Sequence, residues 1–211
     1  MCEVIVLFNG YSLRLENGTM KANCSCTLIK ASKNIIVDTM TAWDREKIIE
    51  ALKQHNITPD KIDYVVCTHS HADHIGNNNL FLNAEHIIGT CIHRGEIFLE
   101  KNLKDEAYEI CPGVKIIATP GHTAEDVTVL VQSTTSGKSV WFAITGDLFE
   151  KEEDILIPSI WKELGTVELQ RDQSHWRSYI INFADFIIPG HGPMFSVTND
   201  MRKIIKNQEV C

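Results

Sequence analysis

The sequence contains no apolar run that approaches the roughly 20 residues of a membrane span. It also lacks low-complexity segments and linkers rich in glycine, proline or serine. The apolar start of the chain, Met1 to Phe8, has no basic leader and no small-residue cleavage site, so we expect a first strand there and not a signal peptide. These absences favour a single domain over residues 1–211 that does not enter a membrane.

Positive charge is in short supply. Twenty lysines and arginines face 28 aspartates and glutamates, which gives a formal net charge of −8. Proteins that hold nucleic acid through its phosphates usually carry a basic surface. The charge balance therefore disfavours an extended RNA footprint but leaves a short one open.

The cysteines form no recognisable disulfide framework or zinc knuckle, because their number is odd and their spacings fit neither pattern. We predict buried, reduced thiols, which indicate a reducing compartment. Cys24 and Cys26 should face the same side of a strand. The seven cysteines are Cys2, Cys24, Cys26, Cys67, Cys91, Cys111 and Cys211.

Histidine, by contrast, is concentrated in one short segment, Thr68 to His74, that follows an apolar run typical of a buried strand. His69 and His71 alternate, so they point the same way on an extended chain. Asp73 and His74 follow where we expect the strand to turn into a helix. Imidazole nitrogen and carboxylate oxygen are donors that zinc prefers, so the segment predicts a metal site.

Three further candidate ligands, His122, Asp147 and His191, stand at equivalent places along the chain. Each follows a predicted strand and lies beside a glycine, which we expect to permit close approach of the backbone to a metal. Side chains at strand ends converge on one edge of a sheet, where α/β ligand sites are usually built. The strands concerned are predicted over 114–119, 140–145 and 185–188.

The remaining pattern predicts alternating strands and helices. Pro59-Asp60 is expected to form a turn, and the segments 10–23 and 150–166 are expected to be loops that set specificity. Strands are predicted over 4–8, 26–30, 34–38, 63–68, 86–89 and 127–132, and helices from Thr41 or Asp44 to about 55, over 167–182 and over 199–206.

Seven donors exceed what one tetrahedral zinc ion takes, and they suit two divalent ions that share a carboxylate. Such a site, roughly 3.5–4 Å across, makes a nucleophile from water near neutral pH and neutralises anionic charge. This predicts hydrolysis of an ester, amide, thioester or phosphodiester. We expect zinc, with iron and manganese as alternatives that the same donors accept.

The order of these motifs, His-x-His-x-Asp-His, Gly-His, Gly-Asp and Gly-His-Gly, resembles the metallo-β-lactamase fold superfamily over about residues 3–195. The resemblance implies an α/β fold, a four-layer αβ/βα sandwich in which two mixed sheets pack face to face with helices outside. It also implies a bridging role for Asp147 and, for Asp38, support of the histidine loop through hydrogen bonds. The first metal would be held by His69, His71 and His122, and the second by Asp73, His74 and His191.

Departures from the superfamily pattern narrow the expected function. Asp147 stands where the best-known β-lactamases carry a cysteine, and about 20 residues after His191 leave no room for the glutathione-binding domain of glyoxalase II. We see no segment for the extended arm of the tRNA-processing branch. The chain looks most like a minimal, nuclease-like member. That resemblance implies a zinc-dependent endoribonuclease acting on the 3′ end of histone pre-mRNA, a cytosolic and nuclear location, and a homodimer.

For the chemistry, we expect Asp73 to orient the attacking water and accept its proton. His175, near the start of the helix before the last ligand strand, is the first candidate for a general acid. The pair His93-Arg94 is a second candidate, and Arg171 and Arg177 are expected to contact phosphate.

Three other functions stay open at this stage. They are a small-molecule thioester or lactone hydrolase, a mononuclear iron persulfide dioxygenase, and a binding protein that keeps its metals for structure. The acidic loop that starts at Glu150 would repel phosphate if it lined the pocket. Trp161 in that loop is expected either to pack over the site or to be half-buried.

Overall fold

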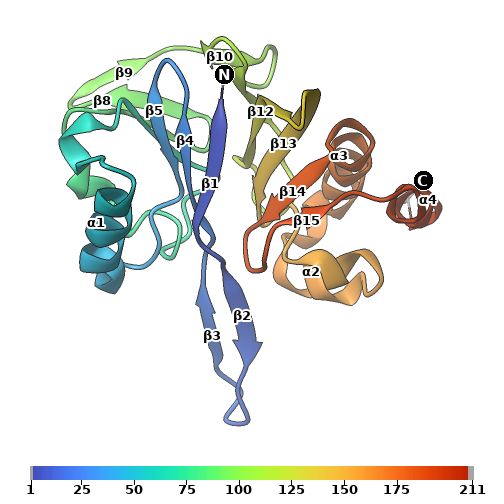
Figure 1. Cartoon of the computed structure of the whole chain (residues 1–211). Helices are drawn as coiled ribbons and strands as arrows, with labels where there is room; N and C mark the ends of the chain where they lie inside the picture. The colour runs from blue at the N-terminus through green and yellow to red at the C-terminus, as the bar shows by residue number, and fades with distance from the viewer. Residues whose placement is uncertain (1, 209–211) are drawn as a thin grey trace.

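The computed structural model describes residues 2–208, and its framework is a pair of mixed β-sheets (Figure 1). In the first sheet, β5, β6 and β7 run parallel to one another, and in the second, β13 and β14 are parallel. The first sheet has the order β1 (Glu3–Phe8), β4 (Cys26–Lys30), β5 (Asn34–Val37), β6 (Tyr64–Cys67), β7 (Glu85–Ile88), β8 (Cys91–Arg94) and β9 (Ile97–Leu99). The second has the order β10 (Tyr108–Cys111), β11 (Val114–Ala118), β12 (Val127–Thr135), β13 (Lys138–Gly146), β14 (Phe186–Pro189) and β15 (Phe195–Ser196).

The two sheets bury one face of each against the other. Ile29 and Val66 of the first sheet belong to the same buried cluster as Val129 and Ile188 of the second. The opposite faces are covered as well, so the central strands read as continuous apolar runs without a polar alternation. This is why the runs over β4, β6 and β14 could be predicted as buried strands.

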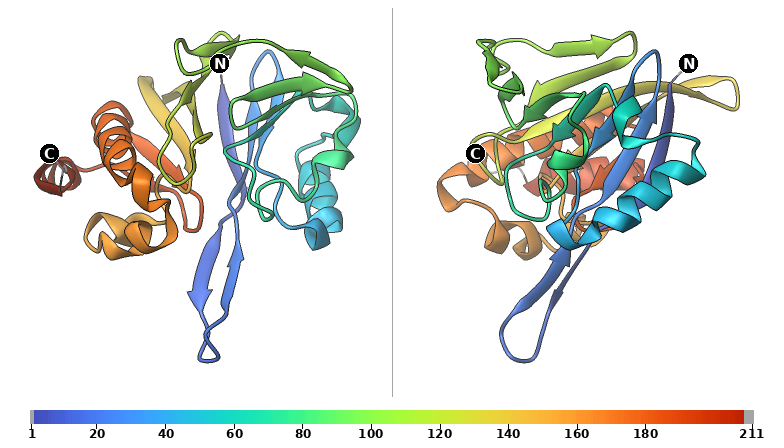
Figure 2. Two further views of the ribbon diagram at one scale, coloured as in Figure 1. Left: turned by 180° about the vertical axis from the view of Figure 1, so that it is seen from behind. Right: turned by 90° about the vertical axis from the view of Figure 1, so that its left-hand side faces the viewer.

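Helices cover the two outer faces (Figures 1 and 2). On the first sheet, α1 (Arg45–Gln54) packs Ile48 and Leu52 against the strands. On the second, α3 (Gln170–Phe183) and α4 (Asn199–Gln208) contribute to a third apolar cluster. The layers therefore run helix, sheet, sheet, helix, which confirms the predicted αβ/βα sandwich. Among residues 2–208, no helix is both long and apolar enough to cross a membrane.

Short helical turns connect these elements. The expected turn at Pro59 is a 3-10 turn, and the segment 150–166, expected to be a loop, contains a turn and a short helix. The elements are η1 (Ala42–Asp44), η2 (Pro59–Lys61), η3 (Asn78–Leu80), η4 (Glu152–Ile155), η5 (Val167–Leu169) and α2 (Ser159–Leu164).

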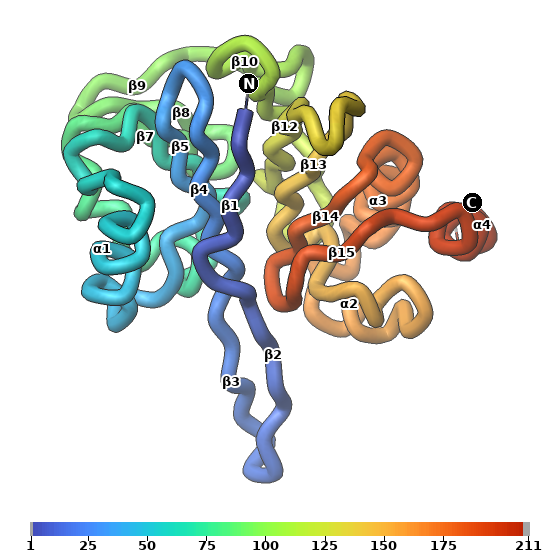
Figure 3. The backbone as a smooth tube through the Cα atoms, in the orientation of Figure 1, coloured from blue at the N-terminus to red at the C-terminus, as the bar shows by residue number. Residues whose placement is uncertain are grey.

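The segment 10–23, expected to be a loop, is a β-hairpin of β2 (Tyr11–Arg14) and β3 (Met20–Asn23). It projects from the body of the molecule as an arm (Figure 3), contrary to the expectation that no segment forms one. Gly18 in the turn has φ +82°, a conformation that glycine adopts without strain. Asn17-Gly18 between two short segments is the sequence signal that could have revealed the hairpin.

The predicted helix after His74 does not form, and turns lead instead to η3. The chain is tied there to the loop that follows β5. Gly76 donates its N–H to the carbonyl of Met40 at 2.8 Å. The Asn77 side-chain amide donates to the carbonyls of Thr39 and Thr41, at 2.7 Å each. These bonds to a distant segment replace the local bonds of a helix.

The cysteines are free thiols in the part of the chain that the structure describes. Cys24 and Cys26 lie in the same apolar cluster, but Cys24 stands in the connection between β3 and β4, so the two do not share a strand as predicted. Cys91 is exposed, contrary to the expectation that all are buried, and Cys211 lies outside the described residues. The buried thiols are Cys2, Cys24, Cys26, Cys67 and Cys111.

Candidate metal centre

All seven predicted ligands lie at one edge of the sandwich. β6, β11, β13 and β14 each end at this edge, and the candidate ligands stand in the turns that follow them. β6 is followed by His69, His71, Asp73 and His74, β11 by His122, β13 by Asp147, and β14 by His191.

The first group of donors consists of His69, His71, His122 and Asp147, whose ligand atoms all lie within 4.8 Å of one another. Nδ1 of His71 is 2.9 Å from Nε2 of His69 and 3.1 Å from Nε2 of His122. Three imidazoles and one carboxylate at such distances are a donor set that suits a tetrahedral zinc ion.

The second group consists of Asp73, His74 and His191, again with ligand atoms within 4.8 Å. Asp147 stands between the groups. Its Oδ2 lies 3.5 Å from Nε2 of His122 and 3.2 Å from Nε2 of His191, and its Oδ1 lies 3.3 Å from Nε2 of His74. The carboxylate is therefore placed to bridge two ions.

The residues fit divalent cations on a further ground. Nε2 of His74 and Oδ1 of Asp147 are buried and have no hydrogen-bond partner. Buried polar atoms without partners are rare and destabilising in folded proteins. A cation bound between them would satisfy both atoms, so the donor arrangement matches a two-metal site.

Three of the ligating rings are held from behind. Nδ1 of His74 lies 3.0 Å from Oδ2 of Asp38, a contact of the kind that the superfamily resemblance implies for that carboxylate. Nδ1 of His191 faces the carbonyl of Asn23 at 3.0 Å, and Nδ1 of His69 faces the Thr68 hydroxyl at 3.2 Å. Such contacts fix the ring orientation and the tautomer, which leaves the other nitrogen for a metal.

Two glycines leave room for neighbouring side chains. The sequence had instead predicted that they let the backbone approach a metal closely. A Cβ at Gly190 would overlap Oδ1 of Asp147, and one at Gly146, whose φ is +51°, would overlap the Thr68 side chain. Gly190 thus permits close approach of the candidate ligand Asp147, and Gly146 permits close approach of Thr68, which contacts His69.

Charge is strongly coupled within the site. Burial opposes ionisation of Asp147, but the imidazoles of His191 and His74 outweigh it and hold the pKa of Asp147 well below its usual range. Burial likewise disfavours the charged form of His191, yet the Asp147 carboxylate raises the pKa of that imidazole to about 9. Burial lowers the pKa of His69 well below its usual range. The centre therefore favours negative charge on Asp147 and positive charge beside it.

His175, the predicted general acid, does not reach the site. It is exposed on α3 and lines a surface recess with Tyr179 and Phe183. Gln173 on the same helix faces the centre instead, with its amide nitrogen 3.3 Å from the carbonyl oxygen of Asp147. At 100° per residue, two positions along a helix place His175 on the other side.

Arg177, predicted to contact phosphate, is 1% exposed and is engaged within the protein. It donates to both carboxylate oxygens of Asp154, at 3.0 and 2.5 Å, and its guanidinium stacks over Phe149 and Trp161. Trp161 is itself buried, so it is not half-buried, and its ring packs against Arg177. Arg171 is exposed on the same helix.

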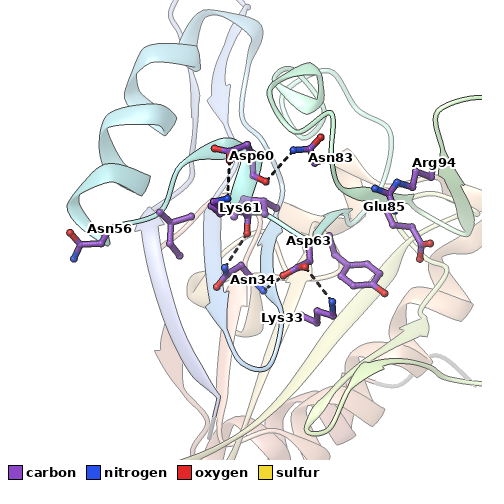
Figure 4. A pocket seen from close by; sticks show the side chains of 12 residues that line it. Lys33, Asn34, Asn56, Asp60, Lys61, Asp63, Asn83, Glu85 and Arg94 are labelled. Atoms are coloured by element: carbon purple, nitrogen blue, oxygen red, sulfur yellow. Dashed lines mark hydrogen bonds and ion pairs between the residues drawn. The ribbon is translucent and has the colours of Figure 1, made fainter.

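The other candidate pair, His93-Arg94, belongs to β8, where His93 stacks on Phe98. Arg94 lines a recess of about 550 Å³ at the opposite edge of the first sheet, where β5, β6 and β7 begin (Figure 4). Lysines in that recess pair with aspartates, as between Lys33 and Asp63 at 3.3 Å. The recess is separate from the metal centre.

Glu150 is the residue of the centre that the sequence analysis missed. Its side chain is 1% exposed, and its Oε1 lies 3.7 Å from Nδ1 of His122. The acidic side chains after Asp147 therefore do not line one pocket. Glu150 faces the centre, Asp154 pairs with Arg177, and Glu152 and Glu153 are exposed. The sequence marked Glu150 only by its position, three residues after Asp147 and directly after the apolar pair Leu148-Phe149.

A fold of two packed sheets with this donor set at one edge defines a metal-dependent hydrolase. Residues 21–191 match the model of the metallo-beta-lactamase superfamily, and the chain belongs to that superfamily.

Individual relatives agree with this assignment. The chain is 36% identical over 197 residues to metallo-beta-lactamase domain-containing protein 1 of Xenopus laevis, covering 92% of this chain and 81% of the frog protein. It covers between 47% and 66% of four further animal relatives. An N-acyl homoserine lactonase of Bacillus is 29% identical over 132 residues, or 56% of this chain and 52% of the lactonase. A putative metallo-beta-lactamase of Thermotoga maritima has a similar structure, with a TM-score of 0.64, 21% identity, and coverage of 92% of this chain and 99% of that chain.

Proposed function

We propose that this metallo-hydrolase is an endoribonuclease that cleaves phosphodiester bonds in RNA, with the 3′ end of histone pre-mRNA as its substrate. The observation that carries the proposal is the bridging position of Asp147 between two complete donor groups. These residues would hold two divalent ions, which we take to be zinc, and such ions would supply a water-derived nucleophile near neutral pH and neutralise the charge of a phosphoryl group.

The protein's own residues supply a base at the rim of the site. The Asp73 side chain is 22% exposed, and its Oδ2 lies 3.8 Å from Nε2 of His191. The Asp73 carboxylate is thus within reach of solvent. We assign to its carboxylate the orientation of the attacking water and the acceptance of its proton.

Cationic side chains beside the centre support a phosphate-bearing substrate in spite of the acidic net charge. Arg14 of the hairpin and Lys151 line a groove of about 220 Å³ between the hairpin and α2. Lys151 packs against the backbone of Gly192, next to the ligand His191. The exposed acids Glu152 and Glu153 line a different recess, near α4. Glu163 does line this groove and pairs with Arg14 at 3.2 Å, so Lys151 is the cation that carries the argument.

The test compares substrates on one zinc-loaded preparation. We expect cleavage of single-stranded RNA that carries a histone pre-mRNA 3′ end, and none of the matching DNA. Asp147→Ala should lose bound metal and cleavage together, whereas the same change at Asp172, exposed on α3, should lose neither. Full cleavage by Asp147→Ala with normal metal content would contradict the two-metal assignment.

Hydrolysis of a small lactone or thioester is the second candidate, and similarity to the N-acyl homoserine lactonase favours it. Turnover of an N-acyl homoserine lactone or S-lactoylglutathione without RNA cleavage would decide for it. Metal analysis addresses the third candidate, since one iron per chain together with oxygen consumption on a persulfide would indicate a dioxygenase. Two zinc ions per chain support hydrolysis.

A further inference from the structure

Glu150 is held rigidly by its main chain next to the metal centre. Its N–H donates to Oδ2 of Asp154 at 2.7 Å, and its carbonyl accepts the N–H of His191 at 2.8 Å. The ion pair between Asp154 and Arg177 anchors the first of these bonds in the core. The backbone of Glu150 is therefore fixed beside the centre, while its side-chain torsions remain free for small rotations.

The carboxylate has no hydrogen-bond partner at either oxygen, although both are buried. The Nδ1 atom of His122 is also buried and also has no partner. These two unsatisfied groups face each other, with 3.7 Å between Nδ1 and Oε1. A buried carboxylate and a buried ring nitrogen at this separation need only a small side-chain rotation to form a hydrogen bond, or one buried water to bridge them.

The other candidate ligands indicate a role for the contact between Glu150 and His122. His74, His191 and His69 each have the rear nitrogen engaged by an oxygen, from Asp38, Asn23 and Thr68 respectively. Nε2 of His122 faces the first donor group, since that atom lies 3.5 Å from Oδ2 of Asp147 and 3.1 Å from Nδ1 of His71. Its rear nitrogen has Glu150 as its available acceptor.

We propose that Glu150 is a positioning residue that acts through His122. Its carboxylate accepts the Nδ1–H of His122, which fixes the ring tautomer and aims the Nε2 lone pair at the first metal position. A carboxylate behind a ligating imidazole also makes the ring a better donor. The inference concerns metal binding and stands on the donor geometry, independently of whether the substrate is RNA.

The test is a zinc titration of metal-free protein against a competing chelator, which yields the affinity of each of the two ions. Glu150→Met removes the acceptor, and we expect one of the two affinities to fall about 10- to 100-fold. Glu150→Gln keeps an acceptor oxygen and should lose clearly less. The matched control is Glu152→Gln, an exposed neighbour with the same loss of charge, which should bind zinc as the unaltered protein does.

Two results would overturn the proposal. Unchanged zinc affinities in Glu150→Met would show that the carboxylate has no role in the site. Loss of one whole zinc equivalent in both variants would make Glu150 a direct ligand, since its carboxylate also lies within 4.8 Å of donor atoms of Asp147 and His191.

A second readout covers the case in which Glu150→Met fails to fold. In protein labelled with ¹⁵N-histidine, the Nδ1–H resonance of His122 should shift or exchange faster in Glu150→Gln than in the unaltered protein. An unchanged resonance in a folded Glu150→Gln protein would also refute the positioning role. Neither measurement uses a substrate, so a failure here is distinct from a failure of the proposed ribonuclease activity.

Discussion

Oδ2 of Asp38 lies 3.0 Å from Nδ1 of His74, and both side chains are almost completely buried. The other oxygen of Asp38 accepts the N–H of Thr68 at 2.7 Å. One carboxylate thus joins the end of β5 to the start of the ligand loop after β6. Asp38 holds a φ of +58°, which asparagine and aspartate tolerate better than most residues do.

Two substitutions at Asp38 should distinguish its tolerance of the positive φ from its contact with His74. We expect Asp38→Ala to weaken zinc binding about 10- to 100-fold, because His74 loses the contact that orients its ring. Asp38→Asn should fold better than Asp38→Ala, since it keeps an acceptor and tolerates the positive φ. Zinc titration and thermal unfolding of both variants check this, and equal behaviour of the two would contradict it.

Gly190→Ala should remove metal without replacing any ligand side chain. The added Cβ would overlap Oδ1 of Asp147 and push the bridging carboxylate out of place. Overpacking of this kind typically costs about 1–3 kcal/mol, or a fall in Tm of roughly 2–12 °C for a chain of this size. The control is Gly137→Ala, where the Cβ meets open space, so zinc content should stay normal there in spite of a φ of +78°.

Arg177→Met should destabilise the fold and not a substrate complex. It leaves Asp154 as an unpaired buried charge, which typically costs about 3–5 kcal/mol. Urea unfolding should show this loss, while Arg171→Met on the same helix should stay within about 0.5 kcal/mol of the unaltered protein. An unchanged free energy of unfolding together with weaker RNA binding in Arg177→Met would support the phosphate contact that the sequence predicted.

Zinc uptake should release protons at pH 7.5. The pKa of His191 in the metal-free protein is raised to about 9, so its imidazole is protonated there and must become neutral to bind a metal. Zinc affinity should therefore rise with pH up to about 9. The stabilisation of the metal-free fold by charged His191 should be complete below pH 6.5 and should disappear as the pH rises through 9. Calorimetry in buffers of different ionisation enthalpy counts the protons, and the exposed His175→Ala variant should release as many as the unaltered protein.

Local patterns were sufficient for much of the fold. The strand at 26–30 is buried on both faces, so its apolar run could be recognised without any partner. At 114–118 buried and half-buried residues alternate, which is the period of a strand. The hairpin at 10–23 was missed because its strands carry a mixed pattern, with exposed Leu13 and Met20 and no buried face. The expected helix after His74 failed because its hydrogen bonds go to Met40, Thr39 and Thr41, which are distant in sequence.

The sequence by itself determined which atoms can bind metal, because imidazole and carboxylate donors after strand ends are a local, countable signal. The order of the motifs along the chain also implied the layered fold, through its resemblance to the superfamily. Only the tertiary structure decided which side chains support that chemistry. His175 and Gln173 differ by two positions on one helix, yet one is exposed and the other faces Asp147. Arg177 and Glu150 read as surface charges, but packing buries one in an ion pair and the other behind His122. Such outcomes depend on which elements meet in space, and spacing along the chain does not record that.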